Sequence, residues 1–266
     1  MKRPVILDGA FGSLLIRESG LTDLAAANIE RPDLVRTIHA RYAKAGSEIV
    51  YANSFSVNPV SCGADTEKLI RAAVDNARAA VPESVRVGLD IAPLGMMLEP
   101  YGELDPKEAA RLYALIVAAG READLAAIET MTSLDEALIA LEAAKNAGMT
   151  AFVTLTFGRE GRTLMGDTPE KAAKELAAAG ADAIGMNCSV GPEAAAEIAA
   201  RFLGATDLPV IVKPNNGLPD ENGNYMMTPE EFADKLAAIA EMGASFVGGC
   251  CGTTPRHIEE LAKVLK

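Results

Sequence analysis

Short apolar runs alternate with longer alanine-rich runs along the whole chain. The short runs are rich in valine and isoleucine, which is typical of buried strands. The longer runs carry apolar residues at helical spacing, and several begin with proline, which fits the first turn of a helix. Repeated strand–helix units with short connections predict a parallel sheet covered by helices.

Eight strands are expected, at residues 5–7, 48–52, 85–89, 125–128, 151–155, 183–186, 210–212 and 246–247. The expected helices cover residues 32–45, 66–80, 106–119, 134–147, 169–179, 192–202 and 229–242, and a last helix begins at Pro255. No linker or low-complexity segment interrupts this rhythm. The pattern predicts one (β/α)₈ barrel domain over residues 1–266, with an open doubly wound sheet as the alternative.

Composition fits this architecture and excludes several partners. The 266 residues are 49% hydrophobic, which is enough for one large core. A net charge of −12 disfavours binding to nucleic acids or anionic membranes. No apolar run approaches the roughly 20 residues of a membrane span. The apolar run near the start stops at Asp8, too early for a signal peptide, so we expect a cytoplasmic protein.

Polar residues follow most of the expected strands. In a (β/α)₈ barrel the carboxyl ends of the strands meet at one face, where the active site lies. We therefore expect one cavity to collect the residues at these ends. They are Asp8, Asn53, Asp90, Glu129, Thr156, Cys188, Lys213 with Asn215, and the pair Cys250-Cys251.

Three of the four cysteines are placed for a zinc site at this face. Cys250 and Cys251 lie between glycines that permit a sharp bend, and Cys188 follows another strand. Three thiolates with no evident fourth protein ligand suit a catalytic zinc ion with an open position. The alternatives are three buried thiols and a redox dithiol at Cys250-Cys251, whose disulfide would be strained. Cys62 is expected to be a free loop thiol.

Two acids are candidates for substrate binding. Asp8 and Glu129 at strand ends suit a substrate ammonium, although either could instead cap a helix or pair with Lys213 or an arginine. Asp90 is a weaker candidate because apolar residues follow it. Lys213 would bind a carboxylate or pair with one of these acids.

Other cofactor signals are weak or absent. His39 and His257 are expected on helix surfaces rather than as ligands. The sequence has no Gly-x-Gly-x-x-Gly motif and no P-loop lysine, so it gives no support for a nucleotide cofactor.

Over nearly its whole length the sequence resembles the homocysteine S-methyltransferase family. The most specific strings are Asn187-Cys188-Ser189 and Gly248-Gly249-Cys250-Cys251-Gly252-Thr253-Thr254-Pro255. More modest matches are Asp8-Gly9-Ala10-Phe11-Gly12-Ser13, Asn53-Ser54-Phe55, Glu129-Thr130 and Lys213-Pro214-Asn215-Asn216-Gly217-Leu218-Pro219. Phe11 and Ser13 replace the methionine and threonine usual in the family, and the chain is short for a member.

The resemblance implies a (β/α)₈ barrel with zinc ligands Cys188, Cys250 and Cys251. It also implies substrate contacts at Asp8, Gly9, Glu129, Thr130 and Asn187. The implied reaction is zinc-dependent methyl transfer to the thiolate of homocysteine, which gives methionine. The homocysteine-binding module of cobalamin-dependent methionine synthase is the part of the family that the sequence resembles most.

The methyl donor is the least determined feature. Neither histidine lies two residues after an aspartate, as a corrinoid-binding motif requires, and the sequence stops at the last barrel helix. We therefore expect methylcobalamin, a corrinoid, to be carried by a separate protein.

S-methylmethionine and betaine are alternative donors. The absence of tryptophan disfavours an aromatic cage for betaine, to which Tyr51, Tyr101 or Phe157 could contribute. A non-catalytic zinc-stabilised thiol-binding barrel is the alternative outside enzymes.

Overall fold

The computed structural model, which describes residues 3–265, contains a closed barrel of eight parallel strands. The strands follow the order β1-β8-β7-β6-β5-β4-β3-β2, and a bridge between Leu7 and Ile49 joins β1 to β2. This confirms the (β/α)₈ prediction and rules out an open sheet. The strands are β1 Val5–Ile6, β2 Ile49–Tyr51, β3 Arg86–Ile91, β4 Leu125–Met131, β5 Ala151–Leu155, β6 Ala183–Asn187, β7 Val210–Lys213 and β8 Phe246–Val247.

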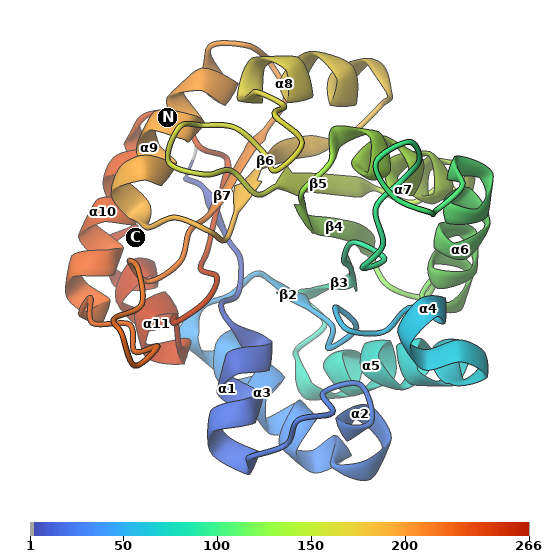
Figure 1. Ribbon diagram of the computed structural model, residues 1–266. Helices are drawn as coiled ribbons and strands as arrows, with labels where there is room; N and C mark the ends of the chain where they lie inside the picture. The colour runs from blue at the N-terminus through green and yellow to red at the C-terminus, as the bar shows by residue number, and fades with distance from the viewer. Residues whose placement is uncertain (1–2, 266) are drawn as a thin grey trace.

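Helices surround the barrel and connect successive strands (Figure 1). The main ones are α3 Pro32–Ala45, α5 Thr66–Ala80, α6 Pro106–Ala119, α7 Leu134–Asn146, α8 Pro169–Ala178, α9 Pro192–Leu203, α10 Pro229–Glu241 and α11 Pro255–Val264. Six of these eight helices begin at a proline. In five of them the N-cap residue before the proline has an extended backbone, and α3 is the exception. Proline fits there because the first helical N–H has no partner within the helix. Within residues 3–265 no helix is long and apolar enough to cross a membrane.

Four short elements lie in segments that the sequence pattern assigned to loops. They are α1 Phe11–Ser19, α2 Ala27–Glu30, α4 Pro59–Cys62 and the 3₁₀ helix η1 Gly63–Asp65. Helix α1 begins after Ala10 without a capping side chain, so its start carries no recognisable signal. It packs against α3 and covers one side of the barrel mouth.

The inside of the barrel has an apolar floor and a polar upper layer. The floor contains one or two inward side chains from each of six strands or strand ends: Leu7, Ile49, Tyr51, Leu125, Ala127, Phe152, Ala183 and Ile211. Side chains alternate across a strand, so residues two or four positions further along also face inward. Those residues are polar: Glu129 on β4, Thr154 on β5, Asn187 on β6 and Lys213 on β7. The fold therefore brings polar groups together at the mouth end.

Both histidines are buried, which corrects the prediction that they lie on helix surfaces. His39 is fully buried because α1 covers that face of α3, and its ring stacks on Phe11 with centroids 4.4 Å apart. His257 lies in the first turn of α11, where Nδ1 accepts a hydrogen bond from the Thr254 N–H. Burial lowers the pKa of both rings, so both are neutral structural residues at pH 7.

Candidate metal centre and substrate pocket

Three cysteine sulfurs converge at the mouth of the barrel. The Sγ atoms of Cys188, Cys250 and Cys251 all lie within 4.8 Å of one another, and the Cys188 and Cys251 sulfurs are 3.8 Å apart. A tetrahedral zinc ion with zinc–sulfur bonds of about 2.3 Å places its sulfurs about 3.8 Å apart. The spacing therefore fits three ligands of one zinc ion. Cys62 lies at the end of α4, outside this group.

Glycines and Thr253 hold the adjacent cysteines in place. A Cβ atom on Gly249 would overlap the side chain of Thr253, and Gly252 has a left-handed φ of 81°. The Thr253 hydroxyl donates to the carbonyl of Cys250 at 2.7 Å and accepts from the N–H of Ala10 at 3.1 Å. The cysteine pair is thus fixed to the end of β1, where Asp8 lies.

Backbone strain marks the other half of the centre. Thr130, Cys188 and Ser189 have φ near +60°, a conformation that non-glycine residues rarely adopt. The amide of Asn187 accepts from the N–H of Thr130 at 2.7 Å and donates to its hydroxyl at 2.7 Å. Because Asn187 directly precedes Cys188, this pair of bonds ties the strained turn of β4 to the strained end of β6.

The thiols influence one another's protonation. Hydrogen bonds from Cys188 and Cys250 lower the pKa of the Cys251 thiol, whereas the contacts with Cys188 and Cys251 together with burial raise that of Cys250 well above its usual value. The cluster thus ionises once readily and resists further ionisation, since adjacent thiolates repel. A divalent cation is the group that would let all three ionise together.

A pocket of about 290 Å³ opens beside the sulfurs. Its lining includes the three cysteines, three acids and a lysine. The apolar part of the lining includes Phe11, Ile16, Leu24 and Phe55. The acids and the lysine are more than nine-tenths buried, while the cysteines are only partly buried. The sulfurs therefore lie nearer the mouth than the charged groups.

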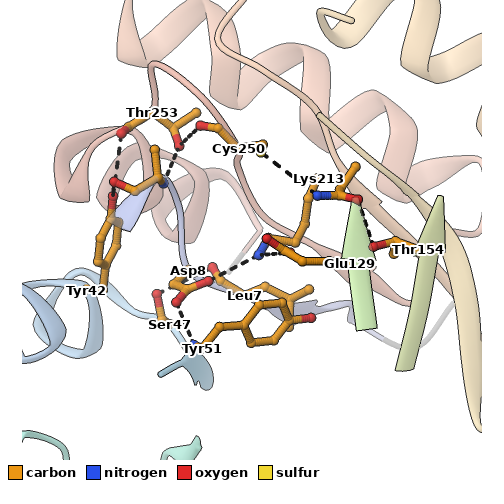
Figure 2. Close-up of polar contacts among 12 residues, drawn as sticks. Leu7, Asp8, Tyr42, Ser47, Tyr51, Glu129, Thr154, Lys213, Cys250 and Thr253 are labelled. Carbon is orange, nitrogen blue, oxygen red and sulfur yellow. Dashed lines mark hydrogen bonds and ion pairs between the residues drawn. The ribbon is translucent and has the colours of Figure 1, made fainter. Parts of the chain in front are cut away.

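A buried lysine connects the two predicted substrate acids. Lys213 Nζ lies 3.3 Å from Asp8 Oδ1 and 3.2 Å from Glu129 Oε2, and it sits 3.8 Å from the centre of the Tyr51 ring (Figure 2). Burial alone would lower the pKa of Lys213, but Glu129 and Asp8 outweigh it and hold that pKa well above its usual value. Burial raises the pKa of Asp8 to about 6. The pairing of both acids with Lys213 was one of the alternatives left open by the sequence.

Asp90 is the third acid in the pocket wall and is 8% exposed. Its Oδ1 atom has no hydrogen-bond partner among the described residues. Burial, followed by the charge of Glu129, raises the pKa of Asp90 well above its usual value. The sequence pattern undervalued this residue, although two-residue alternation from Gly88 on β3 would have turned it inward.

Most of the predicted strand-end residues do face one cavity. Asp8, Gly9, Asn53, Asp90, Glu129, Thr130, Cys188, Lys213, Cys250 and Cys251 line the pocket. Thr156 and Asn215 do not line it. Asn187 is fully buried behind the wall and contacts Thr130, Thr154 and Cys250, so its direct contact with a substrate stays a prediction. Thr253, which fixes the cysteine pair, was assigned no role from the sequence, and Tyr51, considered there only for a betaine cage, instead contacts Lys213.

The fold and the site together define the class of protein: a (β/α)₈ barrel with a cluster of three cysteine sulfurs at its mouth. A model of the homocysteine S-methyltransferase family matches residues 5–265, and the chain belongs to that family.

Two methionine synthases with similar sequences agree with this assignment. Over 292 residues the chain is 33% identical to a methionine synthase of Mycobacterium leprae (strain TN), covering 98% of this chain and 24% of that protein. It is 31% identical over 298 residues to a methionine synthase of Mycobacterium tuberculosis (strain ATCC 25618 / H37Rv), with the same coverages. The chain thus spans about a quarter of the length of these relatives.

The fold is also similar to that of the homocysteine methyltransferase MmuM from Escherichia coli. Crystal structures of its oxidized and metallated forms each match with a TM-score of 0.85 and 24% identity. The match covers 99% of this chain and 96% of MmuM.

Proposed function

We propose that this chain binds homocysteine and transfers a methyl group to its sulfur, giving methionine. Family membership supports the substrate, and the convergence of three cysteine sulfurs beside a pocket with buried acids is the single observation that carries the proposal. The proposed donor is a methylated corrinoid, methylcobalamin, on a separate protein.

The proposed zinc ligands are Cys188, Cys250 and Cys251, whose spacing fits a tetrahedral ion with one open position. When bound, zinc lowers the pKa of a coordinating thiol and so supplies a thiolate at neutral pH, where a free thiol of pKa about 8.5 is mostly protonated. The three cysteine thiolates and Zn²⁺ together carry a charge of −1, which would leave a fourth sulfur electron-rich.

The pocket suggests how the substrate would be oriented. The amino-acid head group would enter the deep, charged part near Asp8 and Glu129, and the sulfur would stay beside the cysteines nearer the mouth. Gly9 and Thr130 line the same space, and Asn187 would act by fixing Thr130. This orientation presents the sulfur to a donor that approaches from the mouth.

The reaction is an in-line displacement at the methyl carbon. The thiol proton leaves to solvent, the homocysteine sulfur forms a bond to the methyl carbon, and the bond from that carbon to the donor breaks. The donor's leaving group keeps the electron pair. The residues of this chain contribute alignment of the two reactants, which lowers the barrier without a covalent enzyme intermediate.

The loops at the mouth support a donor carried by a protein. Large apolar side chains are exposed on loops that follow strands, and such loops lie at the carboxyl face of the barrel. They are Phe55, Met96, Met97, Tyr101, Leu164, Leu218 and Met226. Exposed apolar residues around an opening are typical of a surface that meets another protein.

The aromatic residues do not support a cage for betaine. The face of Tyr51 is occupied by Lys213, and Phe157 is fully buried against Phe202. Tyr101 is 71% exposed and does not line the pocket. The three suggested cage residues therefore do not converge on the site.

A donor screen tests the proposal. Zinc-loaded protein and homocysteine would be incubated with free methylcobalamin, a methylated corrinoid protein, S-methylmethionine or betaine, and methionine would be quantified. We expect the fastest turnover with the corrinoid protein. Turnover with S-methylmethionine or betaine, and none with either corrinoid, would overturn the proposed donor. Methionine formation from none of the four would favour a thiol-binding barrel without turnover.

A further inference from the structure

We propose that Asp90 is a specificity-determining residue that binds the ammonium group of the substrate amino acid. This inference rests on the proposed function and assigns a role to an acid that neither the family strings nor the ion pairs of the pocket account for.

The pocket wall contains three carboxyl groups and one cationic side chain. Lys213 lies within 3.3 Å of Asp8 and Glu129, so the one cation of the wall already serves two of the acids. No ion pair to Asp90 exists in the described part of the chain. The carboxyl group of Asp90 is therefore the one acid of the wall that has no cationic partner.

Asp90 is held rigidly while its side chain stays unsatisfied. The Ser54 hydroxyl donates to the carbonyl of Asp90 at 2.8 Å and accepts from its N–H at 3.1 Å. Strand β3 also pairs Asp90 with Ala127 on β4. A buried oxygen without a partner costs free energy, so its retention in a pocket wall points to a ligand that supplies the missing donor.

The ligand that fits is a primary ammonium rather than a metal ion. Among residues 3–265, the three cysteines are the only group of three or more potential metal ligands close enough to hold one ion, and the three acids of the pocket do not form such a group. An ammonium has three N–H donors and can reach separate acceptors. Homocysteine brings such a group into the same pocket as its thiol, so Asp90 would distinguish amino-acid thiols from thiols without an amine.

The test compares thiols that differ by one head-group element. Homocysteine, 3-mercaptopropylamine (no carboxylate) and 4-mercaptobutanoate (no ammonium) would be titrated calorimetrically into zinc-loaded protein. For Asp90→Asn we expect the dissociation constants of homocysteine and 3-mercaptopropylamine to rise about 10- to 100-fold, because one charged hydrogen bond is lost. The dissociation constant of 4-mercaptobutanoate, which has no ammonium, should change less than about threefold. Asp167→Asn is the matched control, because Asp167 is also 8% exposed but lies outside the pocket and pairs with Lys171.

Unchanged homocysteine affinity in Asp90→Asn, an equal loss for all three thiols, or a loss confined to 4-mercaptobutanoate would each overturn the inference. Zinc content and circular dichroism check folding, and Asp90→Ser replaces Asp90→Asn should the latter not fold. Wild-type protein that binds none of the thiols would instead refute the proposed function, so the two failures are distinguishable.

Discussion

Replacing Lys213 with methionine should destabilise the protein strongly. The lysine is 3% exposed and compensates Asp8 and Glu129 at 3.3 and 3.2 Å, so its loss leaves two buried carboxylates without a cation. Breaking a buried ion pair in this way costs about 3–5 kcal/mol in the free energy of unfolding. For a domain of this size each kcal/mol lowers the melting temperature by about 2–4 °C, so we expect a fall on the order of 10 °C.

The effect should depend on pH in a defined direction. In the folded protein burial raises the pKa of Asp8 from 3.8 to about 6, although Lys213 opposes the rise. A carboxyl group with a raised folded pKa binds its proton more tightly in the folded state, so stability falls as pH increases through that interval. Without Lys213 the pKa of Asp8 in the folded protein rises further. The free energy of unfolding then keeps falling to higher pH, by up to about 1.4 kcal/mol per pH unit. The Lys213→Met variant should therefore lose more stability at pH 8 than at pH 5.

The assay is thermal unfolding of both proteins at pH 5 and pH 8. Lys171→Met is the control, because Lys171 lies 2.8 Å from Asp167 but its side chain is 51% exposed. Exposed pairs contribute less than about 1 kcal/mol, so this variant should melt within a few degrees of wild type. A Lys213→Met variant as stable as wild type at pH 8, or equally destabilised at both pH values, would refute the electrostatic account.

Two further predictions concern the metal and the substrate. Cys188→Ser should reduce bound zinc from about one equivalent to well below half, as measured by elemental analysis after anaerobic purification. Cys62→Ser is the control and should leave the zinc content unchanged. Retention of a full equivalent in Cys188→Ser would show that Cys188 is not a ligand. Glu129→Ala should weaken homocysteine binding about tenfold or more in calorimetry with zinc content intact, and unchanged affinity would show that Glu129 does not hold the ammonium.

Local chemistry made much of the barrel predictable. Proline at a first helical turn identified the starts of helices such as α6 and α10, and β-branched runs identified all eight strands. Strand ends then grouped Asp8, Glu129 and Cys188 at one face, because parallel strands of a barrel share their direction. Helix starts and strands depend on residues close in sequence, and the grouping of strand ends needs only the parallel arrangement of a barrel.

Contacts between distant strands were beyond the sequence pattern. Lys213 is on β7, yet it pairs with an acid that follows β1 and with another on β4, and only the closed barrel brings these three together. The burial of His39 depends on α1, a helix without a capping signal. The left-handed φ of Thr130 likewise cannot be read from its residue type, since it is fixed by the hydrogen bonds to Asn187.

The left-handed backbone at Thr130, Cys188 and Ser189 couples the candidate metal centre to the stability of the whole barrel. Each such residue costs about 1–2 kcal/mol, and all three relax once the chain unfolds. The site therefore does not exist as a local peptide: it is held open by distant packing, and any ion that binds only the folded form shifts the unfolding equilibrium in return. A substitution far from the cysteines can therefore weaken apparent metal binding without touching a ligand, once it destabilises the barrel enough to leave a sizeable fraction of the chain unfolded.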